Sequence, residues 1–519
     1  MISPSSPPFP LLRNLLLAIL SGILLTLSFP PGHFSFVAWV ALVPLLKSIQ
    51  NASLSKAFRL GLISGLAHYL TLIYWIIVVL KHYGNLNILV ALFALLILSL
   101  YLSLYVALFS SLASRLIDSP FSPMLMACYW VALEYLKVHL MTGFPWCLLG
   151  YTQYEHLHLI QSANLVGVYG ISFLIVLVNG FIFRIVTRTS GQSARGLKWD
   201  LLIPILLLMA TWIYGHYHIS GIGSDARAGH RVRAAVIQAN IDQSVKWDPA
   251  YQVETIETYH RLTRSVGTFH PELIVWPETS LPFFFQDSSR FSPGIISLAK
   301  ESEAILVFGS PAYKRQQGTL RYYNRAYMID PDTRQIKYYD KMHLVPFGEY
   351  VPLKRYLPFI NRLVEAAGDF APGEKLTCLT TGDLSLGILI CFEAIFPELA
   401  RALTRDGATI LVNITNDAWF GMTSAPYQHL SMAVFRAVEN RRPMIRAANT
   451  GFSAFIGPAG AIRAETDLFA REVLTGSVTA DAFELTFYSR FGDLFAVSLL
   501  LFSFANILSS LWIRRRRRT

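Results

Sequence analysis

The stretch SLGILICFEAIFPE, residues 385–398, predicts the fold of the part of the chain that surrounds it. Its apolar, β-branched run 386–390 is typical of a buried strand, and Pro397 is typical of the first turn of a helix over 397–405. Cys391 stands where the strand ends, so we expect its sulfur beyond the edge of a sheet. Backbone N–H groups at such a turn lower the pKa of a thiol and hold a negative oxygen. A lone cysteine is more often a small buried hydrophobe, so its meaning depends on two other stretches.

Those two stretches are WPE at 276–278 and DKMHLVPFGE at 340–349. Glu278 ends an apolar strand and Lys341 precedes an apolar run. Taken alone, they are a solvated carboxylate and a surface lysine. Together with Cys391 they supply a base, a cation and a soft nucleophile, each at the edge of an element, which is what acyl transfer through a thioester needs. The carboxylate would take the thiol proton, the thiolate would attack a carbonyl, and the ammonium and a backbone N–H would stabilise the oxyanion.

The composition indicates a membrane protein with more than one domain. The 519 residues are 53% hydrophobic and only 15% charged, which is too apolar for an ordinary soluble enzyme and too long for one domain. The net charge is +11, but no basic helix interleaved with aromatic residues suggests nucleic acid, so we assign this charge to loops beside a membrane. Four cysteines are too few for a disulfide framework, although a bond between Cys378 and Cys391 stays open.

Eight apolar segments predict membrane spans, because each approaches the ~20 residues that a bilayer needs. The first is read as retained, since no small-residue cleavage site follows it. The second is the weakest, because Pro44 stands near its end. The segments are 12–29, 34–49, 60–80, 87–113, 122–140, 163–186, 200–217 and 493–513.

Basic residues fall on one side of these spans, and the positive-inside rule makes that side cytoplasmic. Both termini are then cytoplasmic, and the region from about 218 to 490 lies outside, which is the periplasm if the membrane is a bacterial inner membrane. The basic residues are Arg13, Lys47, Lys56, Arg59, Arg115, Arg184, Arg188, Arg195, Lys198 and Arg514 to Arg518.

Two features of the predicted spans have open interpretations. Glu134 lies within WVALEYLK, where a bare carboxylate is costly and usually faces protein or water. The aromatic loop GFPWCLLGYTQ, 143–153, either lines an entrance for lipid or anchors at the membrane interface.

The remaining chain predicts a separate soluble domain. A transmembrane bundle over 1–217 is followed by a polar linker, 218–230, a domain over 231–490, and a last span with a basic tail over 491–519. Strand and helix signals alternate in the domain, which predicts an α/β fold with its own core. Strands are expected at 234–241, 272–278, 304–310, 325–330, 408–417, 443–448 and 452–456, and helices at 250–266, 292–302 and 426–441.

The order WPE, DKMHLVPFGE and CFE resembles the nitrilase, or carbon–nitrogen hydrolase, superfamily with its Glu-Lys-Cys triad. That resemblance implies a four-layer α-β-β-α sandwich. The whole arrangement, with seven spans before the domain and one after, resembles the bacterial apolipoprotein N-acyltransferase family. QANIDQSVKWD at 238–248, YNRAYMID at 323–330 and NITNDAWFG at 413–421 look like stretches of that family as well.

The resemblance implies roles for seven residues. Glu278 would be the general base, Lys341 the oxyanion stabiliser and Cys391 the nucleophile. The other four would be Glu349 orienting Lys341 and the substrate amine, Phe392 donating its backbone N–H to the oxyanion, and Glu393 and Trp247 supporting the pocket.

The same resemblance implies the substrates. The acyl donor would be a phospholipid, typically phosphatidylethanolamine, and the acceptor the α-amino group of a diacylglyceryl-cysteine at an apolipoprotein N-terminus, in a ping-pong cycle. It implies no metal, cofactor or nucleic acid, and nothing requires more than a monomer. Aromatic residues in 281–286 and 348–370 are either lids that touch the membrane or core packing.

Two other functions stay open on the sequence. A membrane-tethered amidase or nitrilase would use the same active residues, but a tether needs one span rather than eight. A transporter or lipoprotein-binding chaperone with a decayed enzyme domain would not keep an intact triad, and the spans show no paired broken helices of the transporter kind.

Overall fold

The computed structural model divides into two compact units, which we describe separately. Unit 1 comprises residues 1–77, 88–215 and 493–519, and unit 2 comprises residues 78–87 and 216–492. The structure describes residues 10–516 apart from 85, 189–193, 229, 288–289, 317, 334, 351–369 and 481–483.

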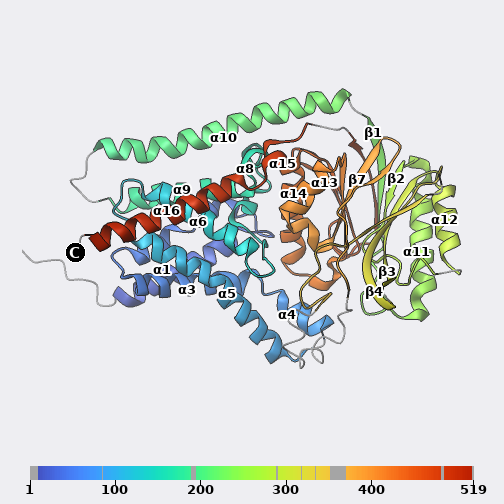
Figure 1. Ribbon diagram of the computed structural model, residues 1–519, viewed down its shortest axis with the longest axis horizontal. Coiled ribbons are helices and arrows are strands. Elements are labelled where there is room, and N and C mark those ends of the chain that lie inside the picture. Colours follow the sequence, from blue (N-terminus) through green and yellow to red (C-terminus); the bar gives the residue numbers. More distant parts are fainter. Residues whose placement is uncertain are drawn as a thin grey trace, which may run out of the picture. The chain divides into compact units, whose positions relative to one another are not determined.

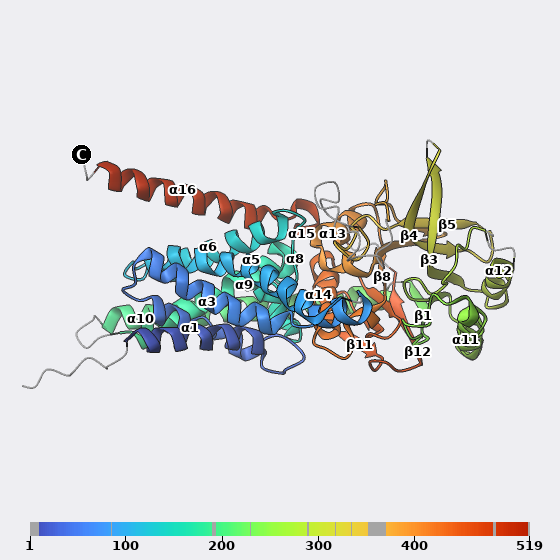
Figure 2. The same ribbon diagram turned by 90° about the horizontal axis from the view of Figure 1, so that it is seen from below.

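Unit 1 is helical, and its helices run side by side in Figure 2. Helix α3 packs against both α1 and α5, and α6 packs against α9 and α16. The helices of residues 10–228 and 494–516 are α1 (Pro10–Leu27), η1 (Ser35–Trp39), α2 (Val43–Ile49), α3 (Leu54–Leu72), α4 (Ile76–Val78), η2 (Val79–Tyr83), α5 (Ile88–Ser114), α6 (Ser122–His139), η3 (Leu149–Gln153), α7 (Leu157–Ile160), α8 (Ala163–Val166), α9 (Val168–Val186), α10 (Ala194–Ala228) and α16 (Leu494–Arg516). Of these, η2 and the last part of α10 belong to unit 2.

Within the described residues, four helices are long and apolar enough to cross a membrane, and a fifth is added if one bent pair counts as a single span. The four are Ile88–Ser114, Val168–Val186, Lys198–Gly221 and Leu494–Ile513, and the pair is Leu54–Leu72 with Ile76–His82. The expected segment 34–49 is instead broken into η1 and α2. Pro44 stands in the first turn of α2, where its missing N–H is tolerated, and this residue therefore begins a new helix rather than continuing one.

Glu134 faces the interior of unit 1. Its side chain is buried and Oε1 accepts a hydrogen bond from the Leu149 N–H at 2.8 Å. The aromatic loop 143–153 is also internal, since Trp146 and Tyr151 are fully buried. These two side chains therefore pack within unit 1, and the choice between an entrance for lipid and an interfacial anchor stays a prediction for the rest of the loop.

The polar stretch 218–230, which we expected as a linker, is helical as far as Ala228 because α10 continues through it. Gly221 and Gly223 each cost about 1 kcal/mol in a helix. Extension of a helix that is already formed adds one hydrogen bond per residue and needs no new nucleus, so a long apolar helix can propagate into such a stretch.

Unit 2 contains two six-stranded sheets, labelled in Figure 1. The first has the order β12-β1-β2-β3-β4-β5 and the second β11-β10-β9-β8-β7-β6. The centres of the sheets are parallel, β1 with β2 and β3 in one, and β7 with β8 and β9 in the other. Parallel strands covered on both faces read as continuous apolar runs, which explains why LSLGILI forms a central strand.

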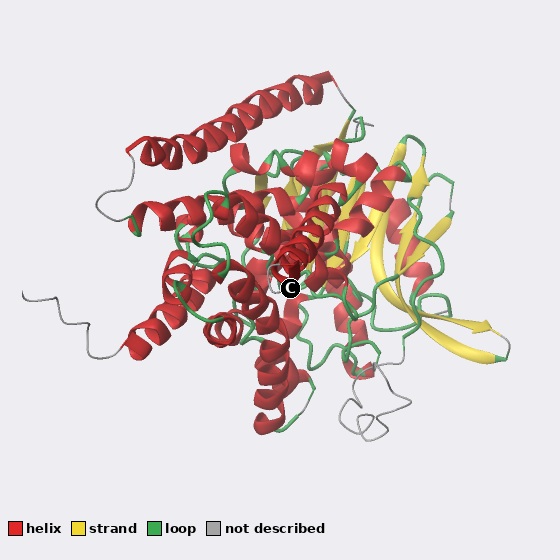
Figure 3. Ribbon diagram, turned by 60° about the vertical axis from the view of Figure 1, so that its left-hand side comes forward, coloured by secondary structure: helices red, strands yellow, loops and turns green. Residues whose placement is uncertain are grey.

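The sheets pack face to face and helices cover their outer faces, which gives the expected four layers (Figure 1). Figure 3 shows the strands and helices in separate colours. The core between the sheets includes Val236 and Val275 from one sheet and Ile388 and Val412 from the other. A second core lies between the first sheet and helices α11 and α12, where Tyr259 stacks on Trp276 with ring centroids 4.7 Å apart. The α-β-β-α sandwich implied by the resemblance is therefore present.

Most expected elements of unit 2 occur within a few residues of their predicted positions, and β5, β6, β11 and β12 were not predicted. The elements are β1 (Arg231–Gln238), η4 (Pro249–Tyr251), α11 (Gln252–Ser265), η5 (Gly267–Phe269), β2 (Leu273–Val275), α12 (Ser292–Glu301), β3 (Ile305–Gln316), β4 (Thr319–Ile329), β5 (Ile336–Asp340), β6 (Leu379–Thr381), β7 (Leu384–Ile390), η7 (Cys391–Ile395), α13 (Pro397–Arg405), β8 (Ile410–Thr415), η8 (Asp417–Phe420), α14 (Ala425–Asn440), β9 (Met444–Ala448), β10 (Ala454–Ile456), β11 (Ile462–Glu465), β12 (Glu472–Thr479) and α15 (Phe487–Phe491).

Candidate active site

Three strand ends bring the predicted residues together in unit 2. Glu278 lies three residues after the end of β2, Lys341 directly follows β5, and Cys391 directly follows β7. Cys391 begins a short 3-10 turn with φ of 54°, a left-handed conformation that is uncommon for a residue other than glycine. Uncommon backbone conformations persist where the surrounding structure fixes them, and they cluster at functional sites. Cys391 is buried, with 8% of the residue exposed.

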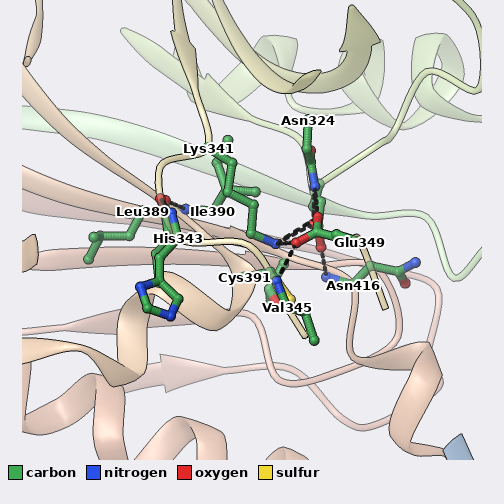
Figure 4. Close-up of polar contacts among 12 residues, drawn as sticks. Asn324, Lys341, His343, Val345, Glu349, Leu389, Ile390, Cys391 and Asn416 are labelled. Atoms are coloured by element: carbon green, nitrogen blue, oxygen red, sulfur yellow. Dashed lines mark hydrogen bonds and ion pairs between the residues drawn. The ribbon is translucent and has the colours of Figure 1, made fainter. Parts of the chain in front are cut away.

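Lys341 is the centre of the cluster shown in Figure 4. Its side chain is 1% exposed, and Nζ lies 2.9 Å from Glu349 Oε2 and 3.5 Å from Glu278 Oε1. Burial alone would lower the pKa of Lys341, but the attraction of Glu349, and then of Glu278, raises it above its ordinary value. Lys341 is therefore a permanent cation at neutral pH.

Glu278 is held by neutral donors on both carboxylate oxygens. The Asn324 amide donates to Oε1 at 2.7 Å, and the Asn416 backbone N–H donates to Oε2 at 3.0 Å. The same Asn324 amide group donates to Glu349 Oε1 at 2.8 Å, and the Val345 N–H donates to Glu349 Oε2 at 2.9 Å. The two carboxylates are thus fixed on either side of one ammonium by a shared amide.

The Cys391 thiol is protonated in this arrangement. Burial raises its pKa well above the ordinary value, the Glu278 charge raises it further, and Lys341 opposes these effects only in part. A protonated thiol near a fixed carboxylate has in that carboxylate a group that can accept its proton.

Glu393 connects two of the strand ends. It is fully buried, and Oε1 accepts hydrogen bonds from the Tyr339 hydroxyl at 2.9 Å and the Met342 N–H at 2.7 Å. Its other oxygen accepts from the Ile390 N–H at 2.7 Å. One carboxylate therefore joins the backbone beside Lys341 to the backbone beside Cys391. Burial raises its pKa to about 7, against the opposing effect of the Ile390 N–H.

The other predicted residues occupy different surroundings. Phe392 packs edge-on against Phe396, with ring centroids 5.2 Å apart. The His343 ring, the nearest histidine in sequence to Lys341, lies 3.7 Å from the Phe396 ring centroid and is directed away from the cluster in Figure 4. Trp247 is 48% exposed. All four cysteines, including Cys378 and Cys391, are free thiols, so the disulfide left open by the sequence is absent.

Two aromatic segments near the site, 281–286 and 348–370, were suggested as lids. In 281–286, Leu281 and Phe285 belong to the buried core beneath the first sheet, which favours core packing over a lid for these two residues. Most of 348–370, the other suggested lid, lies outside the described residues.

Sequence reasoning missed three residues of the site. Asn324 lies in YNRAYMID and Asn416 in NITNDAWFG, which were noted as stretches but given no role. Lys246 lies in QSVKWD, is buried, and donates from Nζ to the Glu278 backbone oxygen at 3.3 Å. Burial lowers the pKa of Lys246 to about 8, and Glu278 opposes that shift. A lysine beside a tryptophan reads as a surface residue in a sequence, so only the fold shows its position.

In the part of the chain that the structure describes, no group of three or more His, Cys, Asp and Glu side chains is placed to hold a metal ion.

Comparisons with known proteins match both parts of the chain. Residues 21–181 match the family model of the apolipoprotein N-acyltransferase N-terminal domain, and residues 233–486 match that of carbon-nitrogen hydrolase. The apolipoprotein N-acyltransferase of Geobacter metallireducens is 46% identical over 97% of this chain and 96% of its own length. The enzyme of the same name from Methylococcus capsulatus is 32% identical over 98% of this chain and 97% of its own length. A solved carbon-nitrogen hydrolase from Helicobacter pylori is 20% identical over 49% of this chain and 90% of its own, with a TM-score of 0.37.

Proposed function

This chain belongs to the apolipoprotein N-acyltransferase family, and we propose that it moves an acyl chain from a membrane phospholipid to the α-amino group of a diacylglyceryl-cysteine at an apolipoprotein N-terminus. The observation that carries the proposal is the cluster of the buried Cys391, Lys341 and Glu278 with the partly buried Glu349, in a chain whose apolar helices match the same family. A tethered amidase would need the same cluster but would not need a helical unit that matches acyltransferases along most of its length.

The first half of the reaction acylates Cys391. Glu278 accepts the thiol proton as the sulfur attacks the ester carbonyl of the phospholipid. Lys341 and the Phe392 N–H stabilise the oxyanion of the tetrahedral adduct. The carbon–oxygen bond to the glycerol then breaks, and the proton on Glu278 passes to that oxygen, so a lysophospholipid leaves and a thioester stays on Cys391.

The second half transfers the chain to nitrogen. The neutral α-amino group attacks the thioester carbonyl, and Glu278 accepts a proton from the nitrogen. The carbon–sulfur bond breaks, the thiolate regains that proton, and an amide leaves. Water must be kept from the thioester during this interval, because hydrolysis would waste the chain. A cysteine residue that is only 8% exposed fits that requirement.

The neighbouring residues have supporting roles in this scheme. Glu349 orients Lys341, which it contacts at 2.9 Å, and helps to bind the amine. Asn324 holds the two carboxylates in place beside Lys341 by donating to both. Glu393 holds the loop of Lys341 against the strand end of Cys391. Trp247, which is half exposed, would contact the acyl chain at the edge of the pocket.

We also propose the membrane arrangement. The shorter apolar helices α1, η1 with α2, and α6 would cross the bilayer with the longer ones, which gives eight spans. The protein would be a monomer in a bacterial inner membrane, with unit 2 in the periplasm and both termini in the cytoplasm. A reporter fused after residue 230 should be active only when exported, and one fused after residue 519 only when cytoplasmic; the reverse at either point contradicts this topology.

Thiol alkylation of the purified protein tests the function. Phosphatidylethanolamine without an acceptor should protect Cys391 from a maleimide, because the sulfur becomes a thioester. The control is the same protein with a diether phospholipid, which has no ester to attack. Equal labelling of Cys391 under the two conditions would contradict acyl transfer through this residue.

A further inference from the structure

Two side chains hold the peptide bond between Cys391 and Phe392 through hydrogen bonds to its carbonyl oxygen. Its carbonyl oxygen, which belongs to Cys391, lies 3.2 Å from His429 Nε2 and 3.5 Å from the Asn413 amide nitrogen. His429 is on α14, Asn413 is on β8, and both side chains are buried. Because a carbonyl oxygen can only accept, the hydrogen of His429 must be on Nε2.

His429 is itself fixed by two buried charges. Its Nδ1 lies 3.0 Å from Asp417 Oδ1 and 3.0 Å from Arg446 Nη2, and Arg446 pairs with Asp417 at 2.7 Å. Burial lowers the pKa of His429, and so does the Arg446 guanidinium. Nε2–H donates to the Cys391 carbonyl, and Nδ1 faces both the Asp417 carboxylate and the Arg446 guanidinium. This buried ion pair leaves the ring little freedom to turn.

The position of the carbonyl decides where the next N–H points. In a trans peptide the C=O and the N–H of the same plane point in opposite directions, and the one cis bond among the described residues is Pro30–Pro31. Helix α14 covers the outer face of the second sheet, whereas Glu278 and Lys341 follow strands of the first sheet (Figure 1). A carbonyl held toward α14 therefore turns the Phe392 N–H away from α14, to the side where the first sheet lies.

We propose that His429 is a positioning residue, which aims the Phe392 N–H at the oxyanion by holding the Cys391 carbonyl. This inference rests on the proposed function, because it concerns the oxyanion of the acylation step. The same contact strengthens the N–H as a donor, since a hydrogen bond to the carbonyl of a peptide polarises its N–H. Asp417 and Arg446 serve the same purpose indirectly, by fixing the ring.

The test compares two reactions of the same sulfur. Acylation by phospholipid develops an oxyanion, and alkylation by iodoacetamide is a direct displacement that does not. We expect His429→Leu to slow acylation roughly 10- to 1000-fold, the range for weakening or losing one oxyanion donor, while alkylation keeps its wild-type rate. His429→Gln should recover much of the acylation rate, because its amide reaches the same carbonyl.

Controls separate positioning from a general loss of structure. Thr404→Val is the matched variant, because the buried Thr404 hydroxyl donates to Ala400 at 2.8 Å within α13, and both rates should stay at wild-type level. If His429→Leu does not fold, His429→Gln and His429→Asn carry the comparison. Both keep an amide near Asp417, and only the longer one reaches the Cys391 carbonyl, so acylation should be slower in the Asn variant.

The outcomes distinguish this inference from the proposed function. A wild-type protein whose Cys391 is alkylated but never acylated overturns both. A wild-type protein that forms the thioester, with a His429→Leu variant that acylates equally fast, overturns the positioning role alone. Equal losses of acylation and alkylation in that variant also overturn it, since they indicate a disordered strand end rather than a misdirected N–H.

Discussion

Replacing Glu349 with Gln should slow the transfer to the amine far more than the acylation of Cys391. Glu349 is the nearer of the two carboxylates on Lys341, at 2.9 Å against 3.5 Å for Glu278. The substitution keeps the size of the side chain and an oxygen that accepts from the Val345 N–H, but removes the charge. Lys341 then keeps Glu278 as its counter-ion, and the base and the cation that acylation needs are both present.

The magnitude follows from the contact. Two unit charges 2.9 Å apart attract by about 6 kcal/mol at an effective dielectric constant of ~20, and the cost of burying both charges cancels a large part of it. Losing an oriented, charged hydrogen bond at a reacting centre typically costs about 2–4 kcal/mol of barrier, roughly 30- to 1000-fold in rate. We assign that cost to the second half-reaction, in which Glu349 would also bind the incoming amine.

The assay measures the two half-reactions in sequence. The variant is incubated with phospholipid, the thioester is quantified by intact mass, and a diacylglyceryl-cysteine peptide is then added. Acyl-enzyme should accumulate and then decay slowly. Glu374→Gln is the control, because this exposed carboxylate pairs only with the neutral Gln316 amide, at 2.7 Å, among its described contacts. If Glu349→Gln forms no thioester, Glu349 acts in the first step and this division of roles is wrong.

Three further outcomes follow from the site. Cys391→Ala should abolish both half-reactions, whereas Cys378→Ala should leave the rate near wild type, because Cys378 is a free thiol that donates to a carbonyl of α13; equal losses measured by acyl transfer would contradict the assignment of the nucleophile. Lys246, with its pKa lowered to about 8, binds fewer protons in the folded than in the unfolded state between about pH 8 and 10.5, so the free energy of unfolding should rise with pH across that window by up to about 3 kcal/mol. Thermal unfolding of Lys246→Met should lack that rise, and a variant with the wild-type pH dependence would show that Lys246 is not its source. Glu393→Gln should lower the free energy of unfolding by about 1–3 kcal/mol. The Glu393 carboxylate accepts four hydrogen bonds, and the substitution replaces one of its accepting oxygens with an NH2 group that cannot accept. An unchanged unfolding temperature would mean that the loops rearrange.

The strand that ends at Cys391 was predictable because its signal is local. A short apolar run, a break and a proline define β7 and α13 without knowledge of their partners, and both occur at the expected residues. The same holds for α11 and α14, whose apolar spacing is helical. The four strands that were missed, β5, β6, β11 and β12, all lie at sheet edges, and they pair only because the rest of the sheet is present.

The site was less predictable than the fold. Glu278, Lys341 and Glu349 lie in motifs, and their meeting depends on the order of strands in the sheet. Asn324 and Lys246 carry no local signal, because an asparagine in a strand and a lysine after a polar run have ordinary surface interpretations. Their roles appear only when β4 places Asn324 between two carboxylates and the loop after β1 turns Lys246 inward.

In the helical part, the sequence predicts where long helices form but not what surrounds a given side chain. Apolar length predicts long helices well when the apolar run is uninterrupted, as in α5 and α9. It does not show that Pro44 begins a new helix within 34–49. Nor can it show that Trp146 and Tyr151 pack inside unit 1, because interfacial and buried aromatic residues look alike in a sequence.

Mass spectrometry of Cys391 after incubation with phospholipid tests the central claim most directly. Without an acceptor, the peptide that contains Cys391 should gain the mass of one acyl chain, and treatment with hydroxylamine should remove it. When a diacylglyceryl-cysteine peptide is added, that mass should leave Cys391 and appear on the peptide's α-amino group. Release of free fatty acid with no adduct on Cys391, or an adduct on Cys378 instead, would contradict acyl transfer through a thioester at this site.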